Sequence, residues 1–403
     1  MANNNENKIL NVPHLRFPEF SGEWKKCTLG EIGKGFDYGM NAAAKPFDGQ
    51  HKYIRITDID ESSAAYIDKD VVSPDGELQD SYLVKANDIL LARTGASTGK
   101  SYLYDNKDGI LYFAGFLIRV NIPSDNAYFV FSQLHLSRYR KWIGIMSARS
   151  GQPGVNSQEY SNYPIYLPKI EEQTKIAKLL KLVDERIAAQ NKIIEDLKKL
   201  KSAISVQLLS GLFPLSRKEQ WREMNLGDIT ENFNRRNKDR SSYPMYSVTN
   251  TSGFSPQNEI FDGKEIKDED ISIYKIIEKG EFAYNPARIN VGSIGRYDNE
   301  DLCMISSLYI CFRPSENIDS DWLLHLLKSD HMIYQYGLYG EGGVRIYLFY
   351  PNFSRIKVSL PPLEVQKRIA NTLNLFDKKI CLETNLLNKF QKQKKHLLSM
   401  MFI

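Results

Sequence analysis

The residues best suited to chemistry in this sequence lie in short polar or glycine-rich loops. Arg and Lys hydrogen-bond to guanine edges, Asn and Gln pair with adenine edges, and glycine lets the backbone approach a phosphate or a groove. Each loop taken singly is equally consistent with an ordinary surface loop. The candidate nucleic-acid contacts are Arg93, Thr94, Ser97, Thr98, Lys100, Arg149, Ser150, Gln152, Asn156, Arg235, Arg236, Asn237, Lys238, Asn250, Arg288, Asn290 and Arg345.

Catalytic motifs are not convincing. The loop Gly95–Ser101 has three residues between its glycines where a nucleotide-binding phosphate loop needs four. The tripeptide Asn285–Ala287 begins like an amino-methyltransferase tetrad, but Arg288 replaces its aromatic residue and no Gly-rich cofactor loop opens a dinucleotide-binding unit. The six histidines show no metal-ligand spacing. We therefore predict no catalytic residue, no cofactor and no metal site.

The elements that must position these loops form an imperfect internal repeat. Trp24–Ile32 recurs as Trp221–Ile229, an offset of 197 residues, and Leu167–Ala177 recurs as Leu360–Ala370, an offset of 193. The stretches between these anchors barely match. The sequence thus predicts two halves that share a framework but differ in surface.

Each half divides into a globular region and a long helix. The globular regions mix short apolar runs with turn residues and a few helices, such as 128–146 and 320–336, which predicts an α+β fold. Residues 169–210 and 362–402 contain no glycine, and proline stands at the start of each of these segments. The expected boundaries are 1–168 and 215–360 for the globular domains, and 169–214 and 361–403 for the long helices.

Both long helices carry apolar residues at alternating steps of four and three, the pattern of a coiled-coil seam. We predict that they pair as an antiparallel coiled coil, although packing of each helix on its own globular domain is an alternative. The predicted seams are Ile176, Leu180, Val183, Ile187, Ile194, Leu197, Ile204 and Leu208 in the first helix, and Ile369, Leu373, Phe376, Ile380, Leu387, Phe390, Leu397 and Met401 in the second.

Polar residues interrupt both seams at equivalent positions. An antiparallel register that places Lys201 opposite Glu383 also places Gln190 opposite Lys394. A desolvated lysine would then gain a carboxylate partner, so we predict this register.

Composition and charge narrow the class of protein. The chain has 403 residues, 42% of them hydrophobic, and a net charge of +4. It lacks an apolar run long enough to cross a membrane, an apolar signal-peptide core and any CxxC spacing, which predicts a cytoplasmic protein that does not bind membranes. The segments 169–210 and 361–403 carry net charges of +3 and +5, which leaves −4 for the rest. Any nucleic-acid contact by the globular domains must therefore use local basic clusters.

These features together resemble the specificity subunits of type I restriction-modification systems, over the full length of the chain. The resemblance depends most on the duplicated element that begins at Leu167–Pro168 and at Leu360–Pro361 and continues into the heptads. Pro13–Phe20, Tyr53–Ile59 and Asn87–Gly95 also match the family pattern, whereas the second half departs from it at Lys279–Asn285.

The resemblance implies a division of labour. Two target-recognition domains would each read one half of a split double-stranded DNA sequence, and the paired helices would act as spacer. Two methyltransferase subunits would dock along the helices, and restriction subunits would complete the nuclease. This chain would perform no chemistry, because adenine methylation uses S-adenosylmethionine on the methyltransferase subunit, and translocation and cleavage use ATP and Mg²⁺ on the restriction subunit.

Two other classes remain open at the level of sequence. The chain could be a coiled-coil interaction protein that presents two divergent domains to other proteins, or a DNA methyltransferase with a hidden active site. DNA binding by gel shift would separate the first from a specificity subunit, and methylation by the chain alone would reveal the second.

Overall fold

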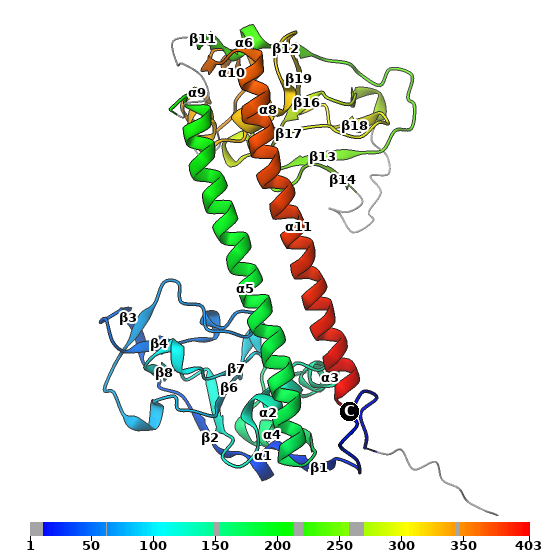
Figure 1. Cartoon of the computed structure of the whole chain (residues 1–403). Coiled ribbons are helices and arrows are strands. Elements are labelled where there is room, and N and C mark those ends of the chain that lie inside the picture. Colours follow the sequence, from blue (N-terminus) through cyan, green and yellow to red (C-terminus); the bar gives the residue numbers. More distant parts are fainter. Residues whose placement is uncertain (1–10, 62, 149–152, 213–220, 258–269, 344–345) are drawn as a thin grey trace, which may run out of the picture. The chain divides into compact units, whose positions relative to one another are not determined.

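The computed structural model describes residues 11–61, 63–148, 153–212, 221–257, 270–343 and 346–403. The chain forms two compact units, residues 1–191 with 386–403 and residues 192–385 (Figure 1). Each unit combines one globular region with parts of two long helices, α5 (Ile170–Leu209) and α11 (Leu363–Met401).

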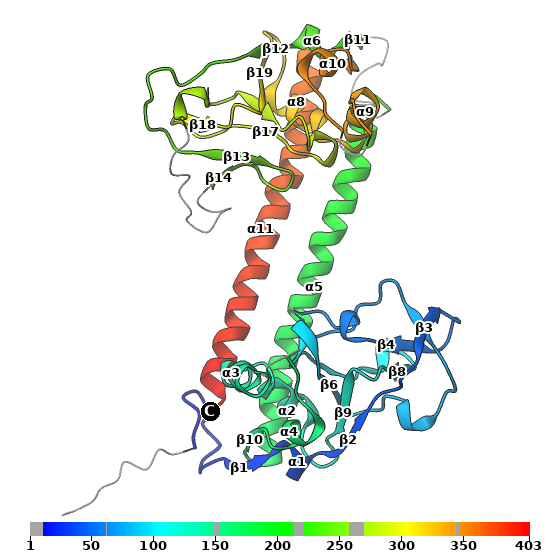
Figure 2. The ribbon, with the colours of Figure 1, turned by 180° about the vertical axis from the view of Figure 1, so that it is seen from behind.

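The globular region of the first unit mixes short strands with short helices, which confirms the predicted α+β class (Figure 2). In chain order its strands and α-helices are β1 (Lys25–Thr28), α1 (Leu29–Ile32), β2 (Lys34–Tyr38), β3 (Ala43–Pro46), β4 (Lys52–Ile54), β5 (Val72–Asp75), β6 (Asp88–Ala92), β7 (Ser101–Leu103), β8 (Leu111–Phe113), β9 (Leu117–Asn121), α2 (Ala127–Gln133), α3 (Ser137–Met146), α4 (Ser157–Ser161) and β10 (Pro164–Leu167).

An antiparallel sheet of four strands, in the order β2-β9-β6-β7, forms the centre of this region. Strand β6 is buried along its whole length because both of its faces are covered. Ile89 and Leu91 pack in one cluster with Ile118 and Val120, while Leu90 packs in another. A strand with no solvent-facing side reads as a continuous apolar run, as the sequence of β6 does.

The second unit repeats this plan. Its strands and α-helices are β11 (Arg222–Asn225), α6 (Leu226–Ile229), β12 (Thr230–Phe233), β13 (Tyr246–Thr249), β14 (Gly253–Pro256), β15 (Lys275–Ile277), β16 (Phe282–Tyr284), β17 (Ile294–Arg296), β18 (Cys303–Ile305), β19 (Ile310–Pro314), α8 (Ser320–Leu327), α9 (Asp330–Tyr339), α10 (Tyr350–Phe353) and β20 (Lys357–Leu360). The sheet order β12-β19-β16-β17 matches that of the first unit.

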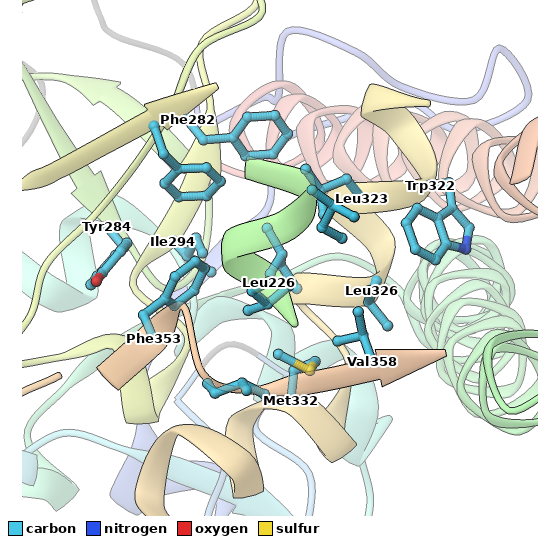
Figure 3. Close-up of a cluster of buried hydrophobic side chains, with 14 of the residues drawn as sticks. Leu226, Phe282, Tyr284, Ile294, Trp322, Leu323, Leu326, Met332, Phe353 and Val358 are labelled. Atoms are coloured by element: carbon cyan, nitrogen blue, oxygen red, sulfur yellow. The ribbon is translucent and has the colours of Figure 1, made fainter. Parts of the chain in front are cut away.

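The main core of the second unit is rich in aromatic residues (Figure 3). The rings of Phe282 and Phe312 stack at 5.2 Å between centroids, and those of Tyr284 and Phe353 at 5.1 Å. Trp322, which is fully buried, brings α8 into the same cluster. This packing holds the sheet, α8 and α10 as one body, because large aromatic side chains bury more apolar area than aliphatic ones.

The duplicated anchor sequences encode the same corner in both units. Strand β1 pairs antiparallel with β10, and β11 pairs in the same way with β20. In α1, Thr28 accepts a hydrogen bond from the backbone of Glu31, whose carboxylate accepts one in return, and Asp228 accepts from the backbone of Asn225 in α6. Capped corners of this kind satisfy amides that the first helical turn leaves free.

The predicted single helices 128–146 and 320–336 are each broken in two, which corrects the prediction. Leu134 ends α2 before α3 begins, and Lys328 ends α8. The hydroxyl of Ser329 then caps α9 by accepting from the backbone of Met332. The apolar pattern continues through both breaks, so periodicity alone does not reveal them.

The repeated sequence at the start of each long helix contains a buried glutamine that holds this part of the fold together. Gln173 accepts from the backbone N–H of Asn126 at 3.0 Å and donates to the carbonyl of Pro168 at 3.0 Å. Gln366 accepts from Asp319 at 2.8 Å and donates to the carbonyl of Pro361 at 2.9 Å. In each unit, one side chain thus ties the first turn of the long helix to the residue that caps α2 or α8.

The long helices run antiparallel within each unit, as predicted. In the first unit Ile176 and Leu180 of α5 cluster with Leu398 and Met401 of α11. In the second unit Leu208 of α5 belongs to one cluster with Val365, Ile369 and Leu373 of α11. No helix in the described part of the chain is both long and apolar enough to cross a membrane.

The predicted register is wrong. The ammonium group of Lys201 contacts Asp377 at 2.5 Å, and Glu383 pairs with Lys379 one turn away on its own helix. Lys394 contacts Asp184 at 2.6 Å, six residues before Gln190 in α5. The helices are therefore offset from the prediction by six residues in the second unit and by the same number in the first.

Candidate nucleic-acid interface

Two of the predicted loops of the first unit lie side by side. The loop that follows β6 is joined to the segment before α4 by hydrogen bonds from Gly95 N to Pro153 O at 2.9 Å and from Val155 N to Arg93 O at 2.9 Å. The backbone N–H of Arg93 also donates to Phe116 O at 3.1 Å, in the turn between β8 and β9. Residues far apart in sequence thus form one loop cluster in the first unit.

Arg93 lies at the centre of this cluster. Its guanidinium stacks over the ring of Tyr38 at 4.9 Å, and its Nε is buried without a hydrogen-bond partner. A side-chain hydrogen bond with Ser157 lowers the pKa of Tyr38, and both the hydrogen bond that its hydroxyl accepts from Ser157 N and the charge of Arg93 act in the same direction. Stacking on an aromatic ring fixes the orientation of a guanidinium, whose planar set of donors suits a ligand with two acceptors.

The other predicted residues of this cluster differ in how far contacts within the protein already engage them. The hydroxyl of Thr98 donates to Gly95 O at 2.7 Å, which shapes the loop. Lys100 lies 3.8 Å from Glu61, a contact at the limit of an ion pair, and Thr94 pairs with Gly154 in an isolated bridge. Ser97 is half-buried on the short 3-10 turn of the loop.

Asn156 is committed to the fold through its side-chain oxygen. That oxygen caps α4 by accepting from Glu159 N at 2.9 Å, and the carboxylate of Glu159 accepts from Asn156 N. Arg149, Ser150 and Gln152, which were predicted beside it, lie outside the described residues.

The equivalent loop of the second unit carries Arg288 and Asn290. It follows β16 as the first cluster follows β6, and Leu348 N donates to Pro286 O at 2.9 Å. In the first unit, Val155 N makes the same contact with Arg93 O. Leu348 follows Val155 by 193 residues, and Pro286 follows Arg93 by the same interval. Arg288 is exposed, whereas Asn290 is half-buried.

The β13–β14 hairpin lies against the same loop. The hydroxyl of Ser293 donates to Val248 O at 2.6 Å, and exposed Asn250 follows at the turn of the hairpin. Arg345, predicted for this surface, lies outside the described residues.

In the predicted stretch 235–238, two side chains are held by partners within the protein and two are exposed. The guanidinium of Arg235 pairs with the carboxylates of Glu278 and Glu281. Asn237 is fully buried, donates to Ser241 O and accepts from Ser241 N. A buried amide with these partners cannot reach a base edge, so the prediction for Asn237 is corrected. Arg236 and Lys238 are exposed.

Sequence reasoning missed two side chains of the first cluster. Tyr38 supports Arg93, and Phe116 is 59% exposed in the turn that accepts the hydrogen bond from Arg93. An exposed phenylalanine beside a candidate base-reading arginine can contact a thymine methyl group. The glycine before Phe116 could have indicated a turn, but the sequence alone does not distinguish Phe116 from a phenylalanine of the core.

The buried carboxylates of the globular regions have structural partners. Burial raises the pKa of Asp88, which accepts from Lys85 N, and burial likewise raises the pKa of Glu281, which accepts from Glu278 N. The two sites are equivalent by the offset of 193 and close the turn before the central strand of each sheet. Within the described ranges, no group of three or more His, Cys, Asp or Glu residues could hold a metal ion.

Comparison with known proteins places this architecture in a family. The type I restriction modification DNA specificity domain model matches residues 21–199 and again residues 218–392. The MjaVIII specificity subunit of a type I restriction enzyme from Methanocaldococcus jannaschii is 25% identical over 98% of this chain and 95% of its own length. The HindI specificity subunit from Haemophilus influenzae is 28% identical over 41% of this chain and 37% of its own length.

Solved structures agree at the level of the fold. The S subunit of a type I restriction-modification system from M. genitalium has a TM-score of 0.60, with 17% identity over 97% of this chain and 99% of its own. A chain from a structure of type I complex assembly and conformational transition has a TM-score of 0.55, with 16% identity over 97% of this chain and 99% of its own. The relatives are recognition subunits, not catalytic ones. Because both halves match one domain model, the chain belongs to the family of type I restriction-modification DNA specificity subunits.

Proposed function

We propose that this chain reads a two-part, asymmetric sequence in double-stranded DNA and assembles with methyltransferase and restriction subunits. The observation that carries the proposal is the duplicated sheet order combined with different polar residues in equivalent loops. Two domains of the same fold with different loops would recognise two different half-sites. We take residues 1–168 and 215–360 as these recognition domains, and 169–214 and 361–403 as the spacer helices between them.

The first half-site would be read by the cluster around Arg93, Thr94, Ser97, Thr98 and Lys100, with Asn156 beside it. Stacking of Arg93 on Tyr38 supports this role, because a preoriented guanidinium matches the two acceptors of a guanine edge. Arg149, Ser150 and Gln152 remain proposed for the same surface.

The second half-site would be read by the loop of Arg288 and Asn290, the turn of the β13–β14 hairpin, the stretch 235–238 and Arg345. The proposal keeps Arg236, Lys238, Asn250, Arg288, Asn290 and Arg345. Arg235 is the weaker member of this set, because two carboxylates already neutralise its guanidinium.

The spacer helices support docking of two copies of a methyltransferase subunit. Leu182 on α5 and Leu375 on α11 are 55% and 68% exposed and occupy equivalent positions of the repeat. Ile193 and Leu386 form a second exposed pair of equivalent positions. Repeated apolar positions on an exposed helix face favour a partner helix, and two equivalent faces favour two copies.

Within such a complex the chemistry belongs to the partners. Adenine methylation would use S-adenosylmethionine on the methyltransferase subunit, and the restriction subunit would translocate and cleave DNA with ATP and Mg²⁺. A complex that acts on chromosomal DNA would work in the bacterial or archaeal cytoplasm.

Mapping of methylated adenines across the genome of a host that carries this chain and its methyltransferase subunit tests the proposal. We expect one motif with two specified halves, which differ in sequence and are separated by an unspecified gap of constant length. Loss of the chain should remove all methylation at that motif. Methylation that persists without the chain, or a motif without a gap, would reject the proposal, and a lack of DNA binding would favour an interaction protein.

A further inference from the structure

One carboxylate in the first unit joins three helices. Asp184 on α5 accepts a hydrogen bond from the hydroxyl of Tyr128 on α2, and its other oxygen lies 2.6 Å from the ammonium of Lys394 on α11. Helix α2 belongs to the globular region, whereas α5 and α11 are the spacer helices. Asp184 therefore connects the recognition domain to both helices of the spacer at one point.

A carboxylate in the second unit occupies the equivalent position. Asp377 on α11 contacts Lys201 on α5 at 2.5 Å, and its other oxygen lies 3.9 Å from Nδ1 of His325 on α8. One turn away, Asn374 accepts from His325 and donates to Asp321 of α8 at 2.8 Å. Here too a helix of the globular region, α8, lies against the acidic residue that joins the two spacer helices.

These contacts are two copies of the same ion pair, one in each unit. Asp377 follows Asp184 by 193 residues, and Lys394 follows Lys201 by the same interval. Each repeat therefore supplies one aspartate and one lysine, and each aspartate pairs with the lysine of the other repeat. The domain partner has diverged, from Tyr128 to His325 with Asp321, while the ion pair between the helices is the same.

Several other charged pairs on these helices act locally. Lys192 pairs with Asp196, and Lys199 with Glu195, within the same helix. Such pairs leave the register free, since sliding one helix past another does not change them. A pair between helices is lost when the helices slip, and these two are partly shielded, with each lysine side chain 24% exposed.

We propose that Asp184 and Asp377 are positioning residues, which seat each recognition domain on the spacer and set the register of α5 against α11. The inference rests on the proposed reading of a two-part site, because register would control which gap between half-sites the chain accepts. The apolar seam alone tolerates slippage by a heptad, whereas an ion pair between the two helices does not.

The test uses the full chain in complex with its methyltransferase subunits, and duplexes that carry the mapped motif with its gap unchanged or altered by one base pair. We expect the variant D184N/D377N to bind both half-sites but to discriminate poorly between gaps. Its preference for the cognate gap should fall by about tenfold, equivalent to about 1.4 kcal/mol. A purely structural defect would instead weaken binding to all gaps equally.

Matched variants complete the design. D196N removes a carboxylate of the same helix whose partner lies one turn away, and should leave the gap preference unchanged. The exchange D184K/K394D restores the pair with reversed charge and should recover more gap preference than either single change. Thermal unfolding of each complex identifies variants that fail to fold, and D184E then replaces D184N.

The outcomes separate the two hypotheses. If the unaltered chain shows no two-part specificity, the proposed function fails. If the unaltered chain reads a two-part site and D184N/D377N keeps its full preference for one gap, the positioning role is wrong. A loss of preference in D196N equal to that in D184N/D377N would also reject it.

Discussion

At the scale of single residues, the same side-chain types serve recognition at one position and folding at another. Arg93 stacks over the ring of Tyr38, whereas Arg235 is held by two carboxylates. Asn250 is exposed, whereas Asn237 is buried in its own turn. The environment thus selects which of the candidates can reach DNA.

Replacement of Arg93 by alanine should weaken recognition of the first half-site only. A base-reading arginine contributes about 1–3 kcal/mol, so binding to the mapped motif should fall by roughly tenfold to a hundredfold. The measurement is competition binding with duplexes mutated in either half. Equal loss of discrimination at both halves would contradict separate reading domains.

His135 predicts a dependence of stability on pH. When Nδ1 carries the proton, the ring donates a hydrogen bond to Phe131 O. Burial lowers the pKa of His135 from 6.5 to about 4, and the charge of Lys394 acts in the same direction. The unfolded chain then binds a proton between these values that the folded chain does not. Stability of the first unit should fall by about 3 kcal/mol as the pH decreases from about 7 to about 4.

The variant His135→Gln checks this dependence, because glutamine does not titrate and can donate to the same carbonyl. Urea unfolding at about pH 7 and about pH 4.5 should show a smaller loss of stability in the variant than in the original chain. The same loss in both would place the acid sensitivity elsewhere.

At the scale of elements, the proposed spacer role of the long helices can be tested by changing their length. Insertion of four residues between Gln190 and Asn191 would lengthen α5 by about 6 Å, or about two base pairs. We expect the accepted gap to lengthen or specific binding to be lost, while both half-sites keep their sequences. Methylation mapping measures both quantities, and a changed half-site would argue against a spacer role.

The element scale also explains what periodicity could and could not predict. The heptads correctly indicate which faces of α5 and α11 meet. They do not determine the axial offset, because a seam of similar apolar residues is compatible with several offsets. The lysines of the seam turn to Asp184 and Asp377, which flank it, so a search restricted to seam residues gave the wrong register.

At the scale of the whole molecule, the repeat predicts stoichiometry. Native mass spectrometry of the chain with its methyltransferase partner should show two partner copies. The single variants L182R and L375R should each retain one copy, and the double variant none, because a charge in an apolar contact is costly to desolvate. L182R binding two copies would place the docking face elsewhere.

The sequence by itself determined the duplicated framework, the α+β class, the two long helices and the family. These features follow from the anchor sequences and the periodicities, because heptads and capped corners depend on residues that are close together in sequence. Only the tertiary structure decided the breaks after α2 and α8, the register of the helices, and the commitment of Asn237 and Arg235 to internal partners. The reason is that the satisfaction of a polar side chain depends on atoms distant in sequence, and a candidate is free for DNA only when the fold does not already use it.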